Sequence, residues 1–363
     1  MYFIIDAHQD LAWNMLTFGR DYTQSAHTTR QREAGGMPVQ MNGESILGWS
    51  EFQKGSVGII FSTLFVSPVR RALAGEWDNQ IYRDFDEAYR LYKTQAEAYH
   101  RLADQHPDKF RLLFTQKDVE SHLELWKLPA PETGHPVGLI ILMEGAEGVR
   151  SPSELKEWWE LGVRFIGPAW AGTRFCGGTR EPGPLTVDGV ALLRGMAEIG
   201  FTLDISHMDQ QAVYQALDIY PGNIIASHAN PLAMLKGSTS NRFLSDDVIA
   251  RLIERDGVIG IIPTNQFLKY GWTTDTPRNF CSLETIADHI DHVCQIAGNA
   301  RHVAWGTDFD GGFGLHHIPL EMDTISDLQK VAPVLAARGY SAEDITAIFG
   351  GNWLDVLRRG MPA

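Results

Sequence analysis

Short, uninterrupted apolar runs recur along the 363-residue chain, and longer segments with helical periodicity separate them. A run that does not alternate with polar residues is typical of a strand in a parallel sheet, because both faces of such a sheet are covered. The predicted strands span residues 2–6, 57–66, 137–143, 163–167, 201–205, 223–226, 258–262 and 302–306. The predicted helices include residues 85–103, 153–161, 188–199, 209–217, 245–255, 283–297 and 325–338.

Eight strands that alternate with helices fit a single α/β domain, a (β/α)8 barrel of the TIM type, which we expect to occupy residues 1–363. The alternative is a doubly wound open sheet. No Gly-rich phosphate loop follows the first strand, however, where the sequence reads Asp-Ala-His-Gln-Asp from Asp6. Two polar, poorly periodic stretches, residues 19–49 and 270–278, are predicted to be loop insertions over the C-terminal mouth of the barrel.

The charge balance narrows the range of partners. The chain has 31 Lys and Arg against 45 Asp and Glu, a formal net charge of −14, which disfavours nucleic acids and anionic membranes as partners. We therefore expect a small-molecule substrate. No apolar run approaches the roughly 18 residues of a membrane span, and the chain enters a strand pattern without a basic leader, so we expect a cytoplasmic protein. Cys176, Cys281 and Cys294 are too scattered for a disulfide framework and are predicted to be free thiols.

Residues with metal-binding side chains directly follow several predicted strands. They are His8 and Asp10, Glu144, His207, His228 and Asp308. The carboxyl ends of the strands of a (β/α)8 barrel converge on one mouth, so these distant residues are expected to meet. Each histidine taken alone is more often an ordinary buried residue, but their joint placement at strand ends predicts one shared site.

The composition of this set indicates metal chemistry. Imidazole nitrogens and carboxylate oxygens are ligands of zinc. Three histidines and three acids exceed the needs of one tetrahedral ion, whereas a bridging carboxylate can hold two ions about 3.5–4 Å apart. We predict that Glu144 bridges two zinc ions. His8 and Asp10, two residues apart on an extended chain, would bind one ion, and His207 and His228 the other.

Two other residues near this mouth have candidate roles. Asp308 could take a proton from an attacking water and return it to a leaving amine; the alternative is a structural acid, a role that suits Asp310 better. Arg242 offers a guanidinium that can bind a carboxylate in bidentate fashion, and an exposed loop arginine is an equally good interpretation. The histidines predicted to lie on the solvated surface are His27, His100, His106, His122 and His135.

Short segments spread over essentially the whole chain form a recognisable pattern. They are Asp6-Ala-His8-Gln-Asp10-Leu, Met143-Glu144-Gly-Ala, Leu161-Gly-Val-Arg164, Asp204-Ile-Ser-His207, Ser227-His228-Ala-Asn230, Asn241-Arg242, Gly257-Val-Ile-Gly260, Gly306-Thr-Asp308-Phe-Asp310-Gly and Gly351-Asn352-Trp-Leu. With these segments the chain resembles the membrane (renal) dipeptidases, peptidase family M19, within the metal-dependent amidohydrolase barrels.

The resemblance implies a dinuclear zinc hydrolase that cleaves dipeptides and tolerates a D-residue at the C-terminal side. The family's ligand pattern falls on His8, Asp10, Glu144, His207 and His228, with Glu144 as the bridge. The resemblance also implies that Arg242 holds the substrate carboxylate and that Asp308 lies close to the substrate amine and the catalytic water. Dimers are common among relatives, which makes a homodimer one option here.

The chain departs from the family pattern at the substrate. Trp170 stands where the family usually has a histidine that stabilises the oxyanion, and an indole donates one hydrogen bond but carries no positive charge. Arg174 or the second metal ion could replace that histidine. A tyrosine of the mammalian members is also absent from residues 262–265. The alternatives are therefore hydrolysis of an N-acyl amino acid, a lactam or a lactone, or a barrel that retains its metals with little turnover.

Overall fold

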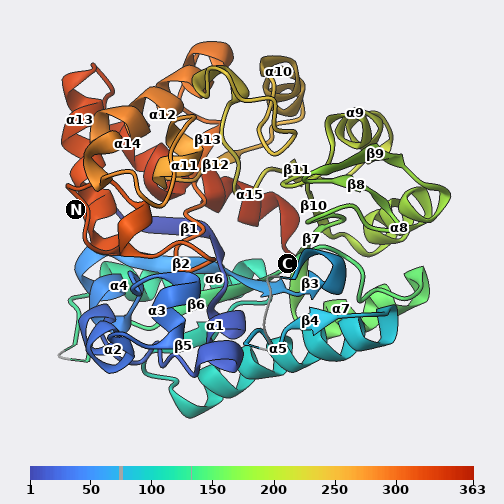
Figure 1. The fold of residues 1–363 in the computed structure, drawn as a ribbon, viewed down its shortest axis with the longest axis horizontal. Coiled ribbons are helices and arrows are strands. Elements are labelled where there is room, and N and C mark those ends of the chain that lie inside the picture. The colour runs from blue at the N-terminus through green and yellow to red at the C-terminus, as the bar shows by residue number, and fades with distance from the viewer. Residues whose placement is uncertain (73–76, 132) are drawn as a thin grey trace.

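A nearly closed barrel of parallel strands forms the centre of the computed structural model, which describes residues 1–72, 77–131 and 133–363 (Figure 1). In order of pairing, the strands are β11 (Ile224–Ile225), β10 (Thr202–Asp204), β7 (Val163–Gly167), β6 (Val137–Glu144), β2 (Val57–Phe65), β1 (Ile4–Gln9), β13 (Val303–Trp305) and β12 (Ile259–Ile261). A parallel bridge between Ala226 and Ile259 joins the two ends of this order. The predicted (β/α)8 barrel is confirmed, and the open-sheet alternative is wrong.

The first and last parts of the chain lie side by side in the barrel. Strand β1 pairs with β2 on one side and with β13 on the other, where Asp6 stands opposite Trp305. The C-terminal helix α15 (Asn352–Gly360) reinforces this junction, because the indole of Trp353 donates a hydrogen bond to the carbonyl of Trp305 over 2.8 Å. In Figure 1 the blue N-terminal and the orange-to-red C-terminal segments accordingly meet along β1.

Helices surround the barrel close to the predicted positions (Figure 1). They include α1 (Leu11–Phe18), α5 (Phe85–Gln105), α6 (Gln116–Lys127), α7 (Leu155–Glu160), α8 (Val187–Ile199), α9 (Gln210–Ile219), α10 (Asp246–Glu254), α12 (Leu283–Ala297), α13 (Val331–Ala337) and α14 (Ala342–Thr346). Side-chain caps mark several of their starts. Ser245, for example, accepts a hydrogen bond from the Val248 N–H at the beginning of α10, which satisfies one of the free amides of the first turn.

Alternate residues of each strand face opposite layers of the core, as the pleat of a strand requires. Ile5, Phe61 and Ile140 belong to a cluster inside the barrel, and their neighbours Ile4 and Ile60 pack in the larger layer between barrel and helices. All five side chains are fully buried. Covered faces on both sides explain why the strands read as continuous apolar runs.

The first predicted loop insertion differs from expectation. Residues 19–49 contain two short helices, α2 (Ala26–Glu33) and α3 (Met37–Asn42), and end at the start of α4 (Trp49–Gly55). The side chain of Ser25 caps α2, a local signal that the weak apolar periodicity of this stretch concealed. Residues 270–278 form an irregular loop up to a short 3-10 turn that begins at Arg278, as predicted.

Some surface predictions were wrong. His122, a residue of α6, and His135 are both buried. The ring of His122 hydrogen-bonds the carbonyl of Gly58, and the ring of His135 hydrogen-bonds the carbonyl of Leu128. The three cysteines are buried free thiols, as predicted. None of the helices among the described residues is both long enough and apolar enough to cross a membrane.

Candidate metal centre and catalytic site

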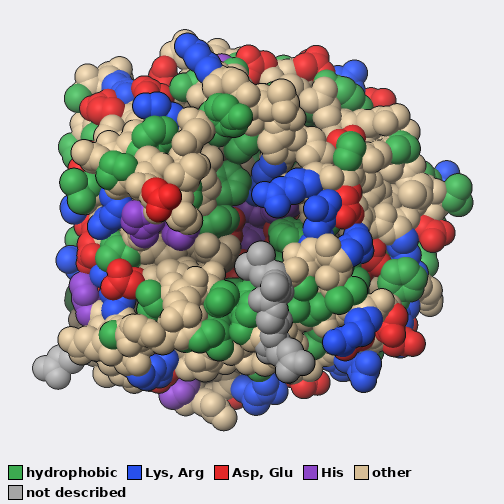
Figure 2. Space-filling view, viewed as in Figure 1, with side chains coloured by type: hydrophobic (Ala, Val, Ile, Leu, Met, Phe, Trp, Pro, Cys, Tyr) green, Lys and Arg blue, Asp and Glu red, His purple; other side chains and the backbone are tan. Residues whose placement is uncertain are grey.

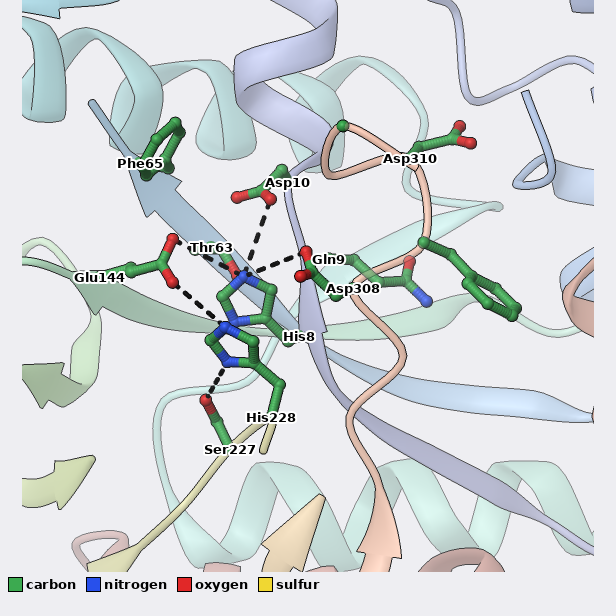
Figure 3. Close-up of polar contacts among 12 residues, drawn as sticks. His8, Gln9, Asp10, Thr63, Phe65, Glu144, Ser227, His228, Asp308 and Asp310 are labelled. Carbon is green, nitrogen blue, oxygen red and sulfur yellow. Dashed lines mark hydrogen bonds and ion pairs between the residues drawn. The ribbon is translucent and has the colours of Figure 1, made fainter. Parts of the chain in front are cut away.

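The predicted ligand residues meet around Glu144, the last residue of β6. Its Oε1 lies 3.0 Å from Nε2 of His207 and 3.2 Å from Nε2 of His228, and its Oε2 lies 3.8 Å from Nε2 of His8. The two imidazoles of His207 and His228 approach within 2.9 Å of each other through their Nε2 atoms. One carboxylate thus faces three histidines that come from three other strand ends, and Figure 3 shows two of them, His8 and His228, beside Glu144.

A second group gathers on the other side of His8. Nε2 of His8 lies 3.7 Å from Asp10 Oδ2 and 3.9 Å from Asp308 Oδ1, and these contacts radiate from the His8 ring in Figure 3. Two sets of three residues bring their ligand atoms within 4.8 Å of one another: His8 with Glu144 and His228, and His8 with Asp10 and Asp308. Because Glu144 faces His8 with one oxygen and His207 and His228 with the other, the arrangement offers two adjoining places for a cation, one on either side of the Glu144 carboxylate.

Backbone geometry at the strand ends aims these side chains into the mouth. His207 and Asp308 have φ angles of 65° and 56°, in the left-handed region that non-glycine residues rarely adopt. Such conformations cost about 1–3 kcal/mol each and cluster at functional sites. The Asp308 corner is held by Asp6, whose carboxylate accepts hydrogen bonds from the backbone N–H of Thr307 (2.7 Å) and from its hydroxyl (2.6 Å).

Burial and charge set the protonation of the cluster. Burial disfavours the imidazolium of His8, but the carboxylates of Glu144, Asp10 and Asp308 outweigh it and raise the pKa of His8 to about 10. Burial, followed by the neighbouring positive charges, holds the pKa of His207 and of His228 well below the usual value. These two imidazoles are therefore neutral, the form in which a ring nitrogen can bind a metal.

The pKa values of two acids in the cluster, Glu144 and Asp308, are raised. Burial raises the pKa of Glu144 well above its usual value, and Asp10 and Asp308 add to this while His8 opposes it. For Asp308 burial is again the largest cause, partly offset by His8 and increased by Asp10, and the pKa rises to about 8. Several buried acids that are crowded together are costly unless a positive charge neutralises them.

A divalent cation fits these residues. Nε2 of His8, Oδ1 of Asp10 and Oε1 of Glu144 are buried and have no hydrogen-bond partner within the described part of the chain. Buried polar atoms without partners are rare in proteins, and an ion is one of their ordinary explanations. Nitrogen and carboxylate oxygen donors in this number suit zinc and related ions.

Arg242 lies next to the cluster with part of its guanidinium free. It is 5 % exposed, and its Nη2 donates a 2.7 Å hydrogen bond to the carbonyl of His228. Its Nε and Nη1 have no hydrogen-bond partner among the described residues. Burial lowers the pKa of Arg242, although the carboxylates of Asp308 and Glu144 oppose this. A buried guanidinium with unused donors is a binding group for an anion.

Trp170 and Arg174, the two candidates for the oxyanion, lie in different places. The indole of Trp170 is near the cluster, with its ring centroid 6.3 Å from that of His207. The guanidinium of Arg174 instead hydrogen-bonds the carbonyl of Val149 and stacks on Phe85 at 4.4 Å. Arg174 lines a separate cavity of about 500 Å³. Within the described part of the chain, its guanidinium contacts Val149 and Phe85 and not the histidines.

Asp310 has the structural role expected of it. Its carboxylate accepts hydrogen bonds from the hydroxyls of Tyr22 and Ser45 and from the backbone of Ile46, and it pairs with Arg20 at 3.1 Å. These contacts tie residues 20–46 to the loop after β13 and so hold this insertion over the mouth.

Sequence reasoning missed several residues that support the site. Ser227 hydrogen-bonds the ring of His228 and the carboxylate of Asp204, and Thr179 hydrogen-bonds the ring of His207. The ring of Phe267 lies 5.5 Å from the guanidinium of Arg242. The motifs Asp204-Ile-Ser-His207 and Ser227-His228 contain Asp204 and Ser227, so a signal was present there. Thr179 and Phe267 carry no such signal, because only the fold brings them to the site.

The view of this face shows a hollow near the centre, with histidine side chains at its floor, Lys and Arg on its rim and hydrophobic side chains along its walls (Figure 2). A (β/α)8 barrel with a histidine and carboxylate cluster at the carboxyl ends of its strands defines the class of this protein as a metal-dependent hydrolase.

Comparison with known proteins narrows the class. The sequence profile of the membrane dipeptidases, peptidase family M19, matches residues 1–360, so the chain belongs to this family. The dipeptidase aclJ of Aspergillus oryzae is 26 % identical over 363 residues, which cover 98 % of this chain and 77 % of aclJ. The name of this relative describes it as a dipeptidase.

Two solved structures share the fold. A structure described as the dipeptidase AC, a metallopeptidase of family M19, has a TM-score of 0.77 and 22 % identity, covering 100 % of this chain and 99 % of that chain. A metallopeptidase from Rhodobacter sphaeroides, solved with a phosphinate mimic of the dipeptide L-Ala-D-Ala, has a TM-score of 0.76 and 22 % identity, covering 99 % of each chain. At this identity the likeness concerns the fold.

Proposed function

We propose that this protein is a zinc-dependent dipeptidase with two ions per chain, which accepts substrates with a D-residue at the C-terminal side. The observation that carries the proposal is the position of the Glu144 carboxylate, with one oxygen 3.0 Å from His207 and the other 3.8 Å from His8. A carboxylate that faces two groups of ligands with different oxygens suits a bridge between two ions. The Rhodobacter sphaeroides structure with its L-Ala-D-Ala mimic supports the choice of substrate class.

His8 and Asp10 would hold one zinc ion, His207 and His228 the other, and Glu144 both. When bound, zinc supplies a Lewis acid for the substrate carbonyl and lowers the pKa of water. The protein itself supplies a buried, preorganised set of donors, so that little rearrangement is needed when the ions enter.

Arg242 orients the substrate. Its Nε and Nη1 have free N–H groups that can donate to a terminal carboxylate, and Nη2 is anchored on the carbonyl of His228. The anchor fixes the carboxylate relative to His228, and thereby places the scissile amide over the histidine and carboxylate cluster. A substrate without a free carboxylate would leave the buried guanidinium unpaired, which is costly.

Asp308 moves the proton. It lies beside the cluster, with Oδ1 3.9 Å from Nε2 of His8, and a carboxylate in this position can accept a proton and donate it again. In this proposal Asp308 accepts the proton of the attacking water and delivers it to the nitrogen of the leaving amino acid. Trp170, beside His207, contributes an N–H donor and apolar surface where relatives have a charged histidine.

The decisive experiment combines metal analysis with a substrate panel. The purified protein is stripped with a chelator, reloaded with zinc, and assayed on L,L- and L,D-dipeptides, N-acyl amino acids, lactams and lactones. We expect two zinc ions per chain, zinc-dependent hydrolysis of dipeptides, and a loss of at least about 10³-fold in kcat for Glu144→Gln. Full zinc occupancy without any dipeptide hydrolysis would overturn the proposal, and preferred hydrolysis of another substrate would select the Trp170-based alternative.

A further inference from the structure

A chain of hydrogen bonds runs from the ring of His228 to a buried aspartate. Nδ1 of His228 lies 2.9 Å from Oγ of Ser227, and Oγ of Ser227 donates to Oδ2 of Asp204. Ser206 joins the same network: its Oγ lies 3.2 Å from Oγ of Ser227 and accepts the backbone N–H of His228 over 3.1 Å. All four residues are 2 % exposed or less.

Counting donors and acceptors gives each bond its direction. The carboxylate of Asp204 is an acceptor only, and its Oδ1 already takes the backbone N–H groups of Ser206 and Ser227, at 3.0 and 2.9 Å. The single hydroxyl proton of Ser227 therefore points to Oδ2 of Asp204. Ser227 Oγ has only acceptor positions left, so the Ser206 hydroxyl and the Nδ1 of His228 must both donate to it.

This polarity determines the tautomer of His228. A neutral imidazole carries one ring proton, and Ser227 requires that proton on Nδ1. Nε2 is then left with its lone pair, and Nε2 is the atom that lies 3.2 Å from Glu144 and 2.9 Å from Nε2 of His207. The hydrogen bond at Nδ1 thus leaves the lone pair of Nε2 available to a cation.

The backbone around Ser227 is held in place by close packing. A Cβ atom at Gly260 or Gly306 would lie 1.9 Å from the carbonyl oxygen of Ser227, so only glycine permits the neighbouring strand ends to approach this closely. His207 lacks an equivalent support. Its Nδ1 lies 2.9 Å from the hydroxyl of Thr179. Among the described residues, no hydrogen bond joins that hydroxyl to a carboxylate.

We propose that Ser227 and Asp204 are positioning residues that lock His228 in the Nδ1–H tautomer and so raise the affinity of the site for zinc. The inference rests on the proposed function only in taking zinc as the ion. The residues that orient a metal-binding histidine typically contribute about 10–100-fold to metal affinity. Ser227→Ala removes the acceptor and leaves a buried N–H without a partner, whereas Asp204→Asn keeps the shape and removes the charge.

The test compares these variants with Ser62→Ala. Ser62 is also a fully buried serine of the barrel, but its hydroxyl has no hydrogen-bond partner among the described residues. Nitrogen NMR of the metal-free, ¹⁵N-histidine-labelled protein reports the tautomer, and competition with a chromogenic chelator reports zinc affinity. Circular dichroism and thermal unfolding check that each variant is folded.

In the wild type and in Ser62→Ala we expect His228 to carry its proton on Nδ1. In Ser227→Ala we expect the tautomers to mix and zinc affinity to fall about 10–100-fold. In Asp204→Asn the side-chain amide would donate to Ser227 Oγ, so the Ser227 hydroxyl can donate to Nδ1 of His228, and we expect a shift towards the Nε2–H tautomer and a similar fall in zinc affinity. An unchanged tautomer and unchanged zinc affinity in a folded Ser227→Ala or Asp204→Asn protein would overturn the inference. Neither readout needs turnover, so a wild type that binds zinc but does not cleave dipeptides would count against the proposed function alone.

Discussion

The hydroxyl of Thr179 lies 2.9 Å from Nδ1 of His207, which makes a residue of the β8–β9 turn the support of an imidazole at the end of the barrel. Strands β8 (Cys176–Gly178) and β9 (Glu181–Leu185) form a small antiparallel hairpin over the mouth. The backbone N–H of Thr179 also donates to the carbonyl of Trp170 over 2.9 Å. The hairpin therefore couples the orientation of His207 to the loop that carries Trp170.

Replacing this hydroxyl is expected to weaken zinc binding. Thr179→Val keeps the shape of the side chain and removes the hydroxyl that hydrogen-bonds Nδ1 of His207, so we expect a loss of about tenfold in zinc affinity, at the lower end for such supporting residues. Chelator competition measures it. Thr94→Val on the exposed face of α5, where the hydroxyl bonds only the carbonyl of Arg90, is the matched control. Equal zinc affinity in the two variants would show that the Thr179 contact does not matter.

The guanidinium of Arg242 is expected to select substrates with a free carboxylate. Arg242→Lys retains the positive charge but loses the fixed Nε and Nη1 donors of the guanidinium, so kcat/KM for dipeptides should fall by about 10²-fold or more. The same change should affect a dipeptide amide much less, because that substrate makes no bidentate contact in the wild type. Steady-state kinetics on both substrates measures the difference, and an equal loss on both would contradict a role for Arg242 in carboxylate binding.

Phe267 is expected to influence the residue that bears the carboxylate. Its half-buried ring lies under Arg242 and continues into the rings of Phe313 and Phe243, with centroids 5.4 and 5.9 Å away. An aromatic surface beside the carboxylate site favours a large apolar side chain there. Phe267→Ala should reduce the preference for C-terminal phenylalanine or leucine over glycine about tenfold. A preference profile identical to that of the wild type would exclude this contact.

Buried neutral histidines make stability fall in acid. Burial is the main reason that the pKa of His122 is lowered to about 4, compared with about 6.5 in the unfolded chain. The folded state thus favours the neutral ring, and the stabilisation, present above pH 6.5, is lost as the pH falls from 6.5 towards 4. The difference corresponds to about 3 kcal/mol at most.

The measurement is urea unfolding of the metal-free protein at several pH values. His122→Gln keeps an N–H donor for the carbonyl of Gly58 and removes the titrating ring, so its stability should decline less steeply between pH 6.5 and 4. His27→Gln, at an exposed position, serves as the control and should follow the wild-type curve. A variant curve parallel to the wild type would mean that protonation of His122 does not oppose folding.

The sequence predicted the barrel and the cluster because both depend on local patterns. Covered strands appear as apolar runs, and the polar residues that directly follow each run fall at the mouth, which is how Glu144 and His228 could be placed together. Burial of His122 could not be foreseen, because it depends on a backbone carbonyl of another element, that of Gly58. The position of Arg174 likewise depends on a carbonyl of another segment, that of Val149. Its closeness in sequence to Trp170 therefore did not show that it lies elsewhere.

The supports of the cluster were the hardest to predict. Thr179 reaches His207 through a hairpin whose strands are only three and five residues long, and such short strands leave little periodicity to detect. Ser227 and Asp204 could have been noticed, since each belongs to a motif that contains a histidine. Their function follows only from the direction of the hydrogen bonds, which no pattern of residue types reveals.

The pairing of β1 with β13, and the hydrogen bonds that Thr307 donates to Asp6, have a consequence for biosynthesis. Synthesis runs from the N-terminus, so β1 with His8 and Asp10 is made long before Asp308, because 301 positions separate Asp6 from Thr307. Until β13 is made, one edge of β1 has no neighbouring strand to pair with. A product that stops before β13 would therefore lack both the strand that closes the barrel beside β1 and the carboxylate of Asp308.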